Sequence, residues 1–190
     1  MIDFHIHTNA SPDAKQALGE AVNKARELKM SHIAITDHYE FMEGEYYKNW
    51  VIKDFKAYGE SIDYYNQKYD DITVLKGIEI GHIDRKKDEI KKVLDSLDFD
   101  FIISSAHFTE DLDLYFPEYF HGKSKHTAYY NYLKEIRDSI NVMDDRVCVI
   151  GHIGYIAKYA PYEDSRLLYE DFREIIDDIL TRIIKRGFGI

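Results

Sequence analysis

The stretch Ile2-Asp3-Phe4-His5-Ile6-His7-Thr8 places two histidines at positions i and i+2 of an apolar segment. Alternate residues of an extended chain lie on one face, so the side chains of His5 and His7 can reach the same point. Two imidazoles in this arrangement can bind a metal ion, although such a pair is also common on an ordinary polar strand face. The stretch therefore predicts a strand that carries half of a metal site, and the missing ligands must come from later segments.

The composition limits the class of protein. A chain of 190 residues with 45% hydrophobic and 14% aromatic content is expected to form one domain spanning residues 1–190. No signal peptide or membrane span is recognisable, and the single cysteine, Cys148, which we expect to be buried in a strand, fits a reducing cytoplasm. The net charge of −10 argues against binding to nucleic acid or to anionic membranes, and an anionic substrate would require bound cations.

Strands and helices are predicted to alternate along the chain. Short apolar strands are expected at residues 32–36, 72–80, 101–104 and 147–150, and a new strand begins at 188. Aromatic and aliphatic residues at helical spacing predict long helices over 46–69 and 164–185, Ser11-Pro12-Asp13 is typical of a helix start, and 108–126 is predicted to be a loop. The alternation predicts parallel strands with buried faces, in either an open doubly wound sheet or a TIM-like barrel.

Candidate metal ligands recur where the predicted strands end. They are His5, His7, Asp37, His38, Glu79, His107 and His152, with Asp13 shortly after the first strand. In a parallel barrel these strand ends meet at one rim, whereas an open sheet would spread them along an edge, and no glycine-rich dinucleotide motif follows the first strand. Each residue alone could be structural, but the recurrence favours a barrel with a metal site. The other histidines, His32, His82, His121 and His126, are interpreted as structural.

The same residues resemble a known family. The motifs His5-Ile6-His7-Thr8, Thr36-Asp37-His38, Gly77-Ile78-Glu79, Ser105-Ala106-His107 and Gly151-His152 match in order those of the PHP (polymerase and histidinol phosphatase) superfamily. Within it, Ser11-Pro12-Asp13-Ala14 and Lys158-Tyr159 are similar to the histidinol-phosphatase family. The resemblance implies an α/β fold, a distorted (β/α)7 TIM-like barrel, that binds up to three divalent metal ions, which are zinc, manganese or iron.

The resemblance also implies a role for each residue. His5, His7 and Glu79 would bind the first ion, Glu79, His107 and His152 the second, and Asp13 and His38 the third. Asp37 would orient a histidine ring, and Lys158 would contact the phosphate. Glu79, His107, His152 and Asp37 are thereby the implied catalytic residues.

The implied reaction is hydrolysis of a small phosphorylated substrate, L-histidinol phosphate, in histidine biosynthesis. Water activated between two ions would attack phosphorus, so that no protein nucleophile is needed. Two alternatives stay open from the residues: a PHP phosphoesterase with another substrate, and a catalytically inactive shortened paralogue.

The family pattern continues with a further strand and an Asp-x-His motif, which residues 1–190 do not contain. The barrel is therefore expected to be C-terminally incomplete. The first and third ions are expected to bind more weakly than the second, because the absent motif would supply ligands to both.

An incomplete barrel predicts self-association, because unpaired strand edges and exposed apolar surface favour pairing with another chain. We expect light scattering coupled to gel filtration to show a homo-oligomer, or a partner segment that covers the open edge. A monomer that unfolds in one cooperative transition would contradict this expectation.

Overall fold

The computed structural model describes all of residues 1–190. The chain consists of two compact units. The first unit comprises Met1–Ile80 with Asp88–Ile103, and the second comprises Gly81–Lys87 with Ser104–Ile190. The single domain expected over 1–190 stays a prediction. No helix in the chain has the length and apolar character needed to cross a membrane.

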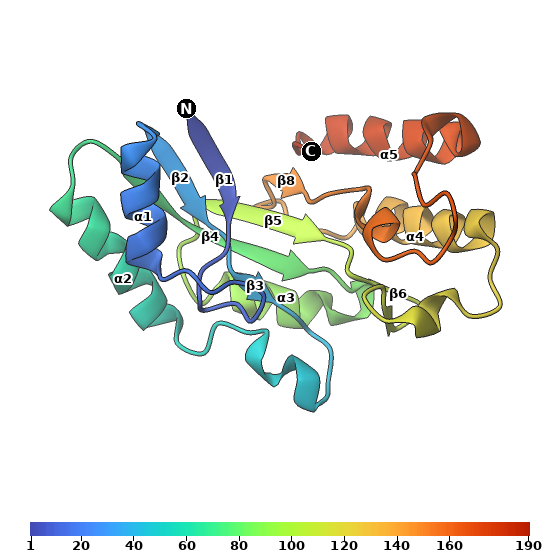
Figure 1. The fold of residues 1–190 in the computed structure, drawn as a ribbon, viewed down its shortest axis with the longest axis horizontal. Coiled ribbons are helices and arrows are strands. Elements are labelled where there is room, and N and C mark those ends of the chain that lie inside the picture. The colour runs from blue at the N-terminus through green and yellow to red at the C-terminus, as the bar shows by residue number, and fades with distance from the viewer. The chain divides into compact units, whose positions relative to one another are not determined.

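The first unit is built on a parallel sheet. Its strands, in spatial order, are β1 (Ile2–Ile6), β2 (His32–Ile35), β4 (Thr73–Gly81) and the start of β5 (Phe101–Ser105) (Figure 1). β1 pairs with β2 and β2 pairs with β4 in parallel, and the short strand β3 (His38–Tyr39) continues along β4 with His38 opposite Glu79. The predicted alternation of strands and helices is confirmed, and two candidate ligands become neighbours on adjacent strands.

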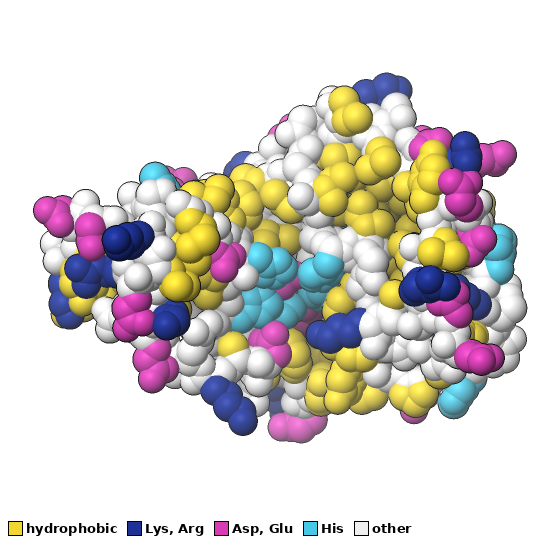
Figure 2. Space-filling model, turned by 45° about the horizontal axis from the view of Figure 1, so that its top comes forward, with side chains coloured by type: hydrophobic (Ala, Val, Ile, Leu, Met, Phe, Trp, Pro, Cys, Tyr) yellow, Lys and Arg dark blue, Asp and Glu magenta, His cyan; other side chains and the backbone are white.

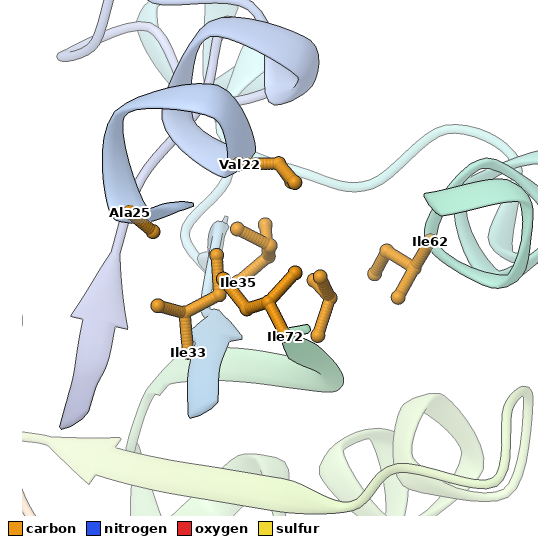
Figure 3. Packing of buried hydrophobic residues seen from close by; sticks show 7 residues of the cluster. Val22, Ala25, Ile33, Ile35, Ile62 and Ile72 are labelled. Atoms are coloured by element: carbon orange, nitrogen blue, oxygen red, sulfur yellow. The ribbon is translucent and has the colours of Figure 1, made fainter. Parts of the chain in front are cut away.

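Helices α1 (Leu18–Glu27), α2 (Phe55–Lys68) and α3 (Lys87–Leu94) follow β1, β3 and β4 in the chain. The core between α1, α2 and the sheet is aliphatic, and Figure 3 shows its side chains meeting from both layers. Its fully or almost fully buried members are Val22, Ala25, Ile33, Ile35, Ile62, Ile72 and Val74. Because burial of one aliphatic side chain contributes roughly 1.5–3 kcal/mol, this cluster holds the strand ends in place.

The helix predicted over residues 46–69 is two elements rather than one. Glu45–Asn49 form a short 3-10 helix, η1, and α2 begins only at Phe55. Asp54 determines this start, because its side chain accepts a hydrogen bond from the backbone N–H of Ala57 at 2.9 Å. The predicted aromatic face is confirmed within α2, where Tyr58 and Tyr65 pack on the aliphatic cluster.

The helix start predicted at Ser11-Pro12-Asp13 is also wrong. These residues form turns after β1, and α1 begins at Leu18, where the N–H of Ala17 donates to the Glu20 carboxylate at 2.7 Å. The polar residues of the turn are used for contacts with β3, which are described below.

The second unit is mainly helical. Its elements are η2 (Asp84–Lys86), the hairpin β6 (Phe108–Thr109) and β7 (Leu112–Asp113), η3 (Pro117–Phe120), α4 (Lys125–Ser139), β8 (Val149–Ile150), η4 (Tyr155–Lys158), η5 (Tyr169–Asp171) and α5 (Arg173–Arg186). The stretch 108–126, predicted to be an irregular loop, contains the hairpin and η3 and buries Leu114 and Tyr119 completely. It is therefore a packed part of the unit.

Two further expectations for the second unit are corrected. The last helix begins at Arg173 instead of residue 164, and at the predicted start the Asp164 carboxylate accepts from the N–H of Arg166 at 3.1 Å, which stabilises a turn. Cys148 is half-buried and precedes the two-residue strand β8. Where a strand was predicted to begin at 188, the structure has a single parallel bridge between Gly189 and Val149. The α5 helix ends at Gly187, whose φ of 72° is left-handed, as expected for a helix stop.

Gly77 in β4 lies where the backbone of the first unit is most closely packed. A Cβ atom on Gly77 would lie 2.6 Å from the carbonyl oxygen of Ile35 and 3.2 Å from that of Phe101. Both neighbours are backbone atoms of flanking strands and cannot rotate away. A side chain at this position would therefore push apart the sheet that carries Glu79.

We expect Gly77→Ala to lower the free energy of unfolding by about 1–3 kcal/mol, the range typical of overpacked sites. Gly154→Ala is the matched control, because a Cβ there meets no atom within 4 Å, and it should leave stability unchanged. Chemical denaturation followed by circular dichroism measures both variants. Equal stability of the two variants would show that the sheet accommodates the methyl group.

Candidate metal centre

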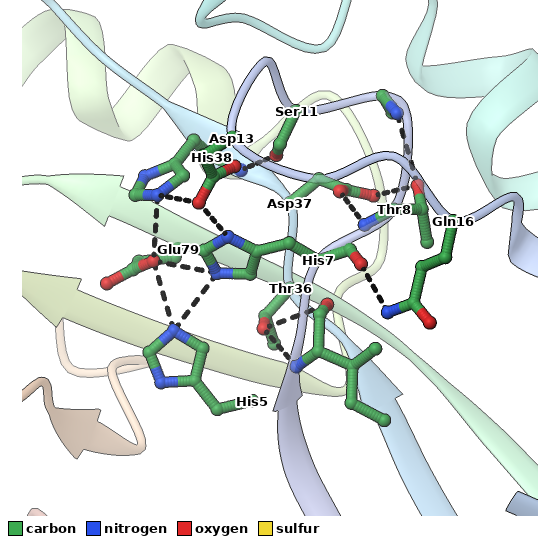
Figure 4. A network of polar contacts seen from close by, with 12 residues as sticks. His5, His7, Thr8, Ser11, Asp13, Gln16, Thr36, Asp37, His38 and Glu79 are labelled. Carbon is green, nitrogen blue, oxygen red and sulfur yellow. Dashed lines mark hydrogen bonds and ion pairs between the residues drawn. The ribbon is translucent and has the colours of Figure 1, made fainter. Parts of the chain in front are cut away.

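The Glu79 carboxylate is the centre of a cluster of histidines in the first unit. Its side chain is 0% exposed, and Oε2 lies 3.1 Å from His5 Nε2 and 3.0 Å from His7 Nε2. The third ring is that of His38, whose Nε2 lies 3.4 Å from the same oxygen. Figure 4 shows the three rings meeting at this atom from β1, its exit and β3. The prediction that these strand ends bring the residues together is confirmed within this unit.

Asp13 adds a second carboxylate to the cluster. Its Oδ2 lies 2.9 Å from His7 Nδ1 and 3.6 Å from His38 Nε2. Ligand atoms of His7, Asp13 and His38 all fall within 4.8 Å of one another, which is close enough for them to share one ion. Imidazole nitrogens with carboxylate oxygens are a donor set that suits zinc, manganese or iron. The residues present therefore fit a divalent metal ion.

Hydrogen bonds from backbone N–H groups to side-chain hydroxyls hold the strand exits that carry these ligands. The Ser11 hydroxyl accepts from the N–H of His38 at 2.7 Å, which links the turn after β1 to β3. The Thr36 hydroxyl accepts at 3.1 Å from the N–H of Ile6, the residue between His5 and His7. Neither Ser11 nor Thr36 was predicted to have this role, because serine and threonine near a strand end carry no distinctive signal.

Asp37 has a different role from the one predicted. Its carboxylate is completely buried and accepts from the backbone N–H of Thr8 at 2.6 Å and from the Thr8 hydroxyl at 2.9 Å. Asp37 therefore holds the chain immediately after His7 instead of orienting a histidine ring. It supports the site through the position of the backbone.

The two carboxylates favour protonated histidines in this cluster. Burial by itself lowers the pKa of His7, but hydrogen bonds and charges from Asp13 and Glu79 outweigh it and raise the pKa to about 9. The pKa of His38 is also raised, because hydrogen bonds to Asp13 and Glu40 outweigh the effect of its burial. Burial would raise the pKa of Asp13, yet the hydrogen bonds from His38 and His7 lower it. The cluster thus carries negative charge that a proton or a metal ion must balance.

The cluster is open to solvent on one side. The His5 side chain is 38% exposed and that of His7 15% exposed, and Figure 2 shows histidine side chains at the molecular surface. On the face drawn there, lysine and arginine side chains are scattered among acidic ones. A small molecule from solvent can therefore reach the exposed histidines directly.

The second unit carries the other predicted ligands. The rings of His107 and His152 stack with centroids 5.3 Å apart, and the ring of Tyr155 contacts both. Gly151, which precedes His152, donates its N–H to the carbonyl of Ser104 at 2.9 Å. The structure thus brings these two histidines together within their unit. Lys158 lies at the end of η4 and is exposed, with its ammonium 5.0 Å from the centroid of the Tyr159 ring.

The buried acid Glu40 was missed in the sequence. Its Oε1 lies 3.1 Å from Nδ1 of His38, and its side chain is only 4% exposed. The signal was present, because Glu40 stands two residues after His38 at the end of a short strand, where alternate residues share a face.

The chain is similar to known proteins along almost its whole length. The PHP domain model matches residues 3–190. A probable histidinol-phosphatase from Clostridium acetobutylicum is 31% identical over 100% of this chain and 71% of its own length, and a histidinol-phosphatase from Lactococcus lactis is 28% identical over 97% and 68%.

A solved structure is similar over the same span. The Lactococcus lactis histidinol phosphate phosphatase, crystallised with zinc, L-histidinol and phosphate, superimposes with a TM-score of 0.90 at 27% identity. The match covers 98% of this chain and 70% of that protein, so the chain has the fold of that protein over the part that it spans. The predicted α/β fold of the distorted TIM-like barrel type is thereby confirmed.

The raised pKa of His7 predicts how the stability of the metal-free protein depends on pH. A histidine with a pKa of 6.5 when unfolded and about 9 when folded stabilises the fold below pH 6.5, and this contribution is lost as pH rises through 9. After chelation of metals, we expect the free energy of unfolding to fall across this window by up to roughly 3 kcal/mol.

The free energy of unfolding of His7→Gln should fall much less over this pH range. The variant should therefore be less stable than the native chain at low pH, and the difference should shrink as pH rises. His32→Gln is the control, because His32 is exposed at the start of β2. Urea denaturation at several pH values measures the effect. Parallel profiles for the native chain and His7→Gln would contradict the assignment.

Proposed function

Because the chain belongs to the PHP domain family and, within it, to the histidinol phosphatases, we propose that it is a metal-dependent phosphatase that hydrolyses L-histidinol phosphate to L-histidinol and phosphate. The observation that carries the proposal is the convergence of three histidine rings on Glu79, with Asp13 beside them. The structure similar to this chain contains zinc together with L-histidinol and phosphate, the two products of this hydrolysis, which supports L-histidinol phosphate as the substrate here.

Divalent ions bound in the cluster would supply positive charge to the phosphoryl group and would acidify a bound water. The part played by the chain is to hold and order the ligands. Glu79 and Asp13 are negative and attract cations into a chain that already carries a charge of −10. Ser11, Thr36 and Asp37 keep the strand exits in place, so that the histidines need little rearrangement when an ion binds.

The finer assignments belong to the same proposal. We assign His5, His7 and Glu79 to a first ion, Glu79, His107 and His152 to a second, and Asp13 and His38 to a third. These ions are zinc, manganese or iron, and Lys158 contacts the phosphate. The order of the motifs in the sequence supports the assignment to three ions. We also propose that the protein is cytoplasmic and acts in histidine biosynthesis.

Activity measurements separate this proposal from the alternatives. We expect the purified chain, with added manganese or zinc, to release phosphate from L-histidinol phosphate and not from p-nitrophenyl phosphate. Release from both substrates would indicate a phosphoesterase of broader specificity. Release from neither would indicate an inactive paralogue and would overturn the proposed function.

The site variants test which residues carry the activity. Glu79→Gln should lower kcat/KM at least about 100-fold, because it removes the charge on which three histidines converge. His32→Gln serves as the control and should retain full activity, because its exposed side chain lies outside the cluster. Elemental analysis of both variants should show loss of metal only in Glu79→Gln.

A further inference from the structure

Glu40 is a buried acid that the three-ion assignment does not use. It follows β3 and is 5% exposed, a degree of burial that is rare for a carboxylate unless a partner compensates its charge. Its Oε1 lies 3.1 Å from Nδ1 of His38. The other nitrogen of the same ring, Nε2, faces Asp13 and Glu79 at 3.6 and 3.4 Å. The imidazole of His38 therefore joins Glu40 on one side to the ligand cluster on the other.

The chemistry of this contact determines which nitrogen can bind a metal. An ionised carboxylate only accepts hydrogen bonds, so Glu40 requires a proton on Nδ1 of His38. In a neutral ring, Nε2 then carries the free lone pair, and this is the nitrogen that faces Asp13 and Glu79. A carboxylate bonded to the far nitrogen also makes the ring a better electron donor toward a metal.

The backbone holds Glu40 in this position. Its N–H donates to the carbonyl of Trp50 at 2.7 Å, and the N–H of His38 donates to the Ser11 hydroxyl at 2.7 Å. The ring of Trp50 meets that of His38 edge to face, with centroids 5.2 Å apart. The imidazole is therefore confined by Glu40, by Trp50 and by the ligand cluster.

We propose that Glu40 is a positioning residue of the metal centre, which holds the His38 ring with Nε2 directed at the ion and strengthens it as a ligand. This role for Glu40 rests on one part of the proposed function, namely that the cluster binds a metal ion. A purely structural role for Glu40 would affect the stability of the fold and would leave the affinity for metal unchanged.

Trp50 provides a readout that is independent of activity. It is the one tryptophan of the chain, so intrinsic fluorescence at long wavelength reports on the surroundings of Trp50, which include the ring of His38. Zinc that replaces a proton on His38 should change this emission. Titration of the metal-free chain with zinc, with a competing chelator to set the free concentration, therefore gives the affinity at this site.

We expect Glu40→Ala to bind the ion that changes Trp50 emission about 10- to 100-fold more weakly than the native chain. Glu40→Gln should show a smaller loss, because its amide oxygen can still accept from Nδ1. The matched control is Glu45→Ala in the same segment, whose carboxylate is 86% exposed and pairs with Lys48, and it should bind zinc as the native chain does.

Circular dichroism at the titration temperature shows whether each variant is folded, and Glu40→Gln keeps the test decisive if Glu40→Ala unfolds. Native affinity in every folded Glu40 variant would overturn the proposal, and so would zinc binding by the native chain without any change in Trp50 emission. If the native chain binds zinc but hydrolyses no phosphomonoester, the proposed function fails and the titration still decides the role of Glu40.

Discussion

The carboxylate of Glu79 is the group on which the first unit depends most. A fully buried carboxylate is costly unless positive charge lies beside it, and here three imidazole nitrogens lie within 3.4 Å of one oxygen. Without a metal, protons on the histidines supply that charge, which explains the raised pKa values of His7 and His38. A divalent ion would replace those protons at the same point, so the cluster that stabilises Glu79 is also the cluster that attracts a metal.

The parallel sheet brings these groups together from distant parts of the chain. His38 lies opposite Glu79 because β3 pairs in parallel with β4, and the pairing of β1 with β2 sets the position of the β1 exit. Close packing keeps this register, since Gly77 leaves no room for a side chain between flanking strands. Polar residues of the strand exits then hold the backbone next to the ligands in place, as Asp37 does by accepting a hydrogen bond from the N–H of Thr8. Family membership and this geometry lead to the same class of chemistry.

Two of the errors made from sequence involve a side chain that bonds to the backbone near a predicted helix start. Residues 46–69 have helical periodicity throughout, yet the helix begins at Phe55, because Asp54 caps it there. Asp164 similarly bonds to the N–H of Arg166 at the predicted start of the last helix, and α5 begins only at Arg173. In both places a local side chain bond to the backbone overrides the hydrophobic pattern, which reports the buried face of a helix but not where the helix starts.

The sequence by itself determined the strand and helix alternation, the family and the candidate ligands at strand ends. These features follow from local periodicity and from residue types at short spacings. Both can be recognised in the sequence without knowledge of tertiary contacts. Only the tertiary structure decided that Asp37 holds Thr8 and that Glu40 meets His38. Such contacts depend on the direction of individual side chains in a packed fold, where a shift of a few ångströms exchanges one partner for another.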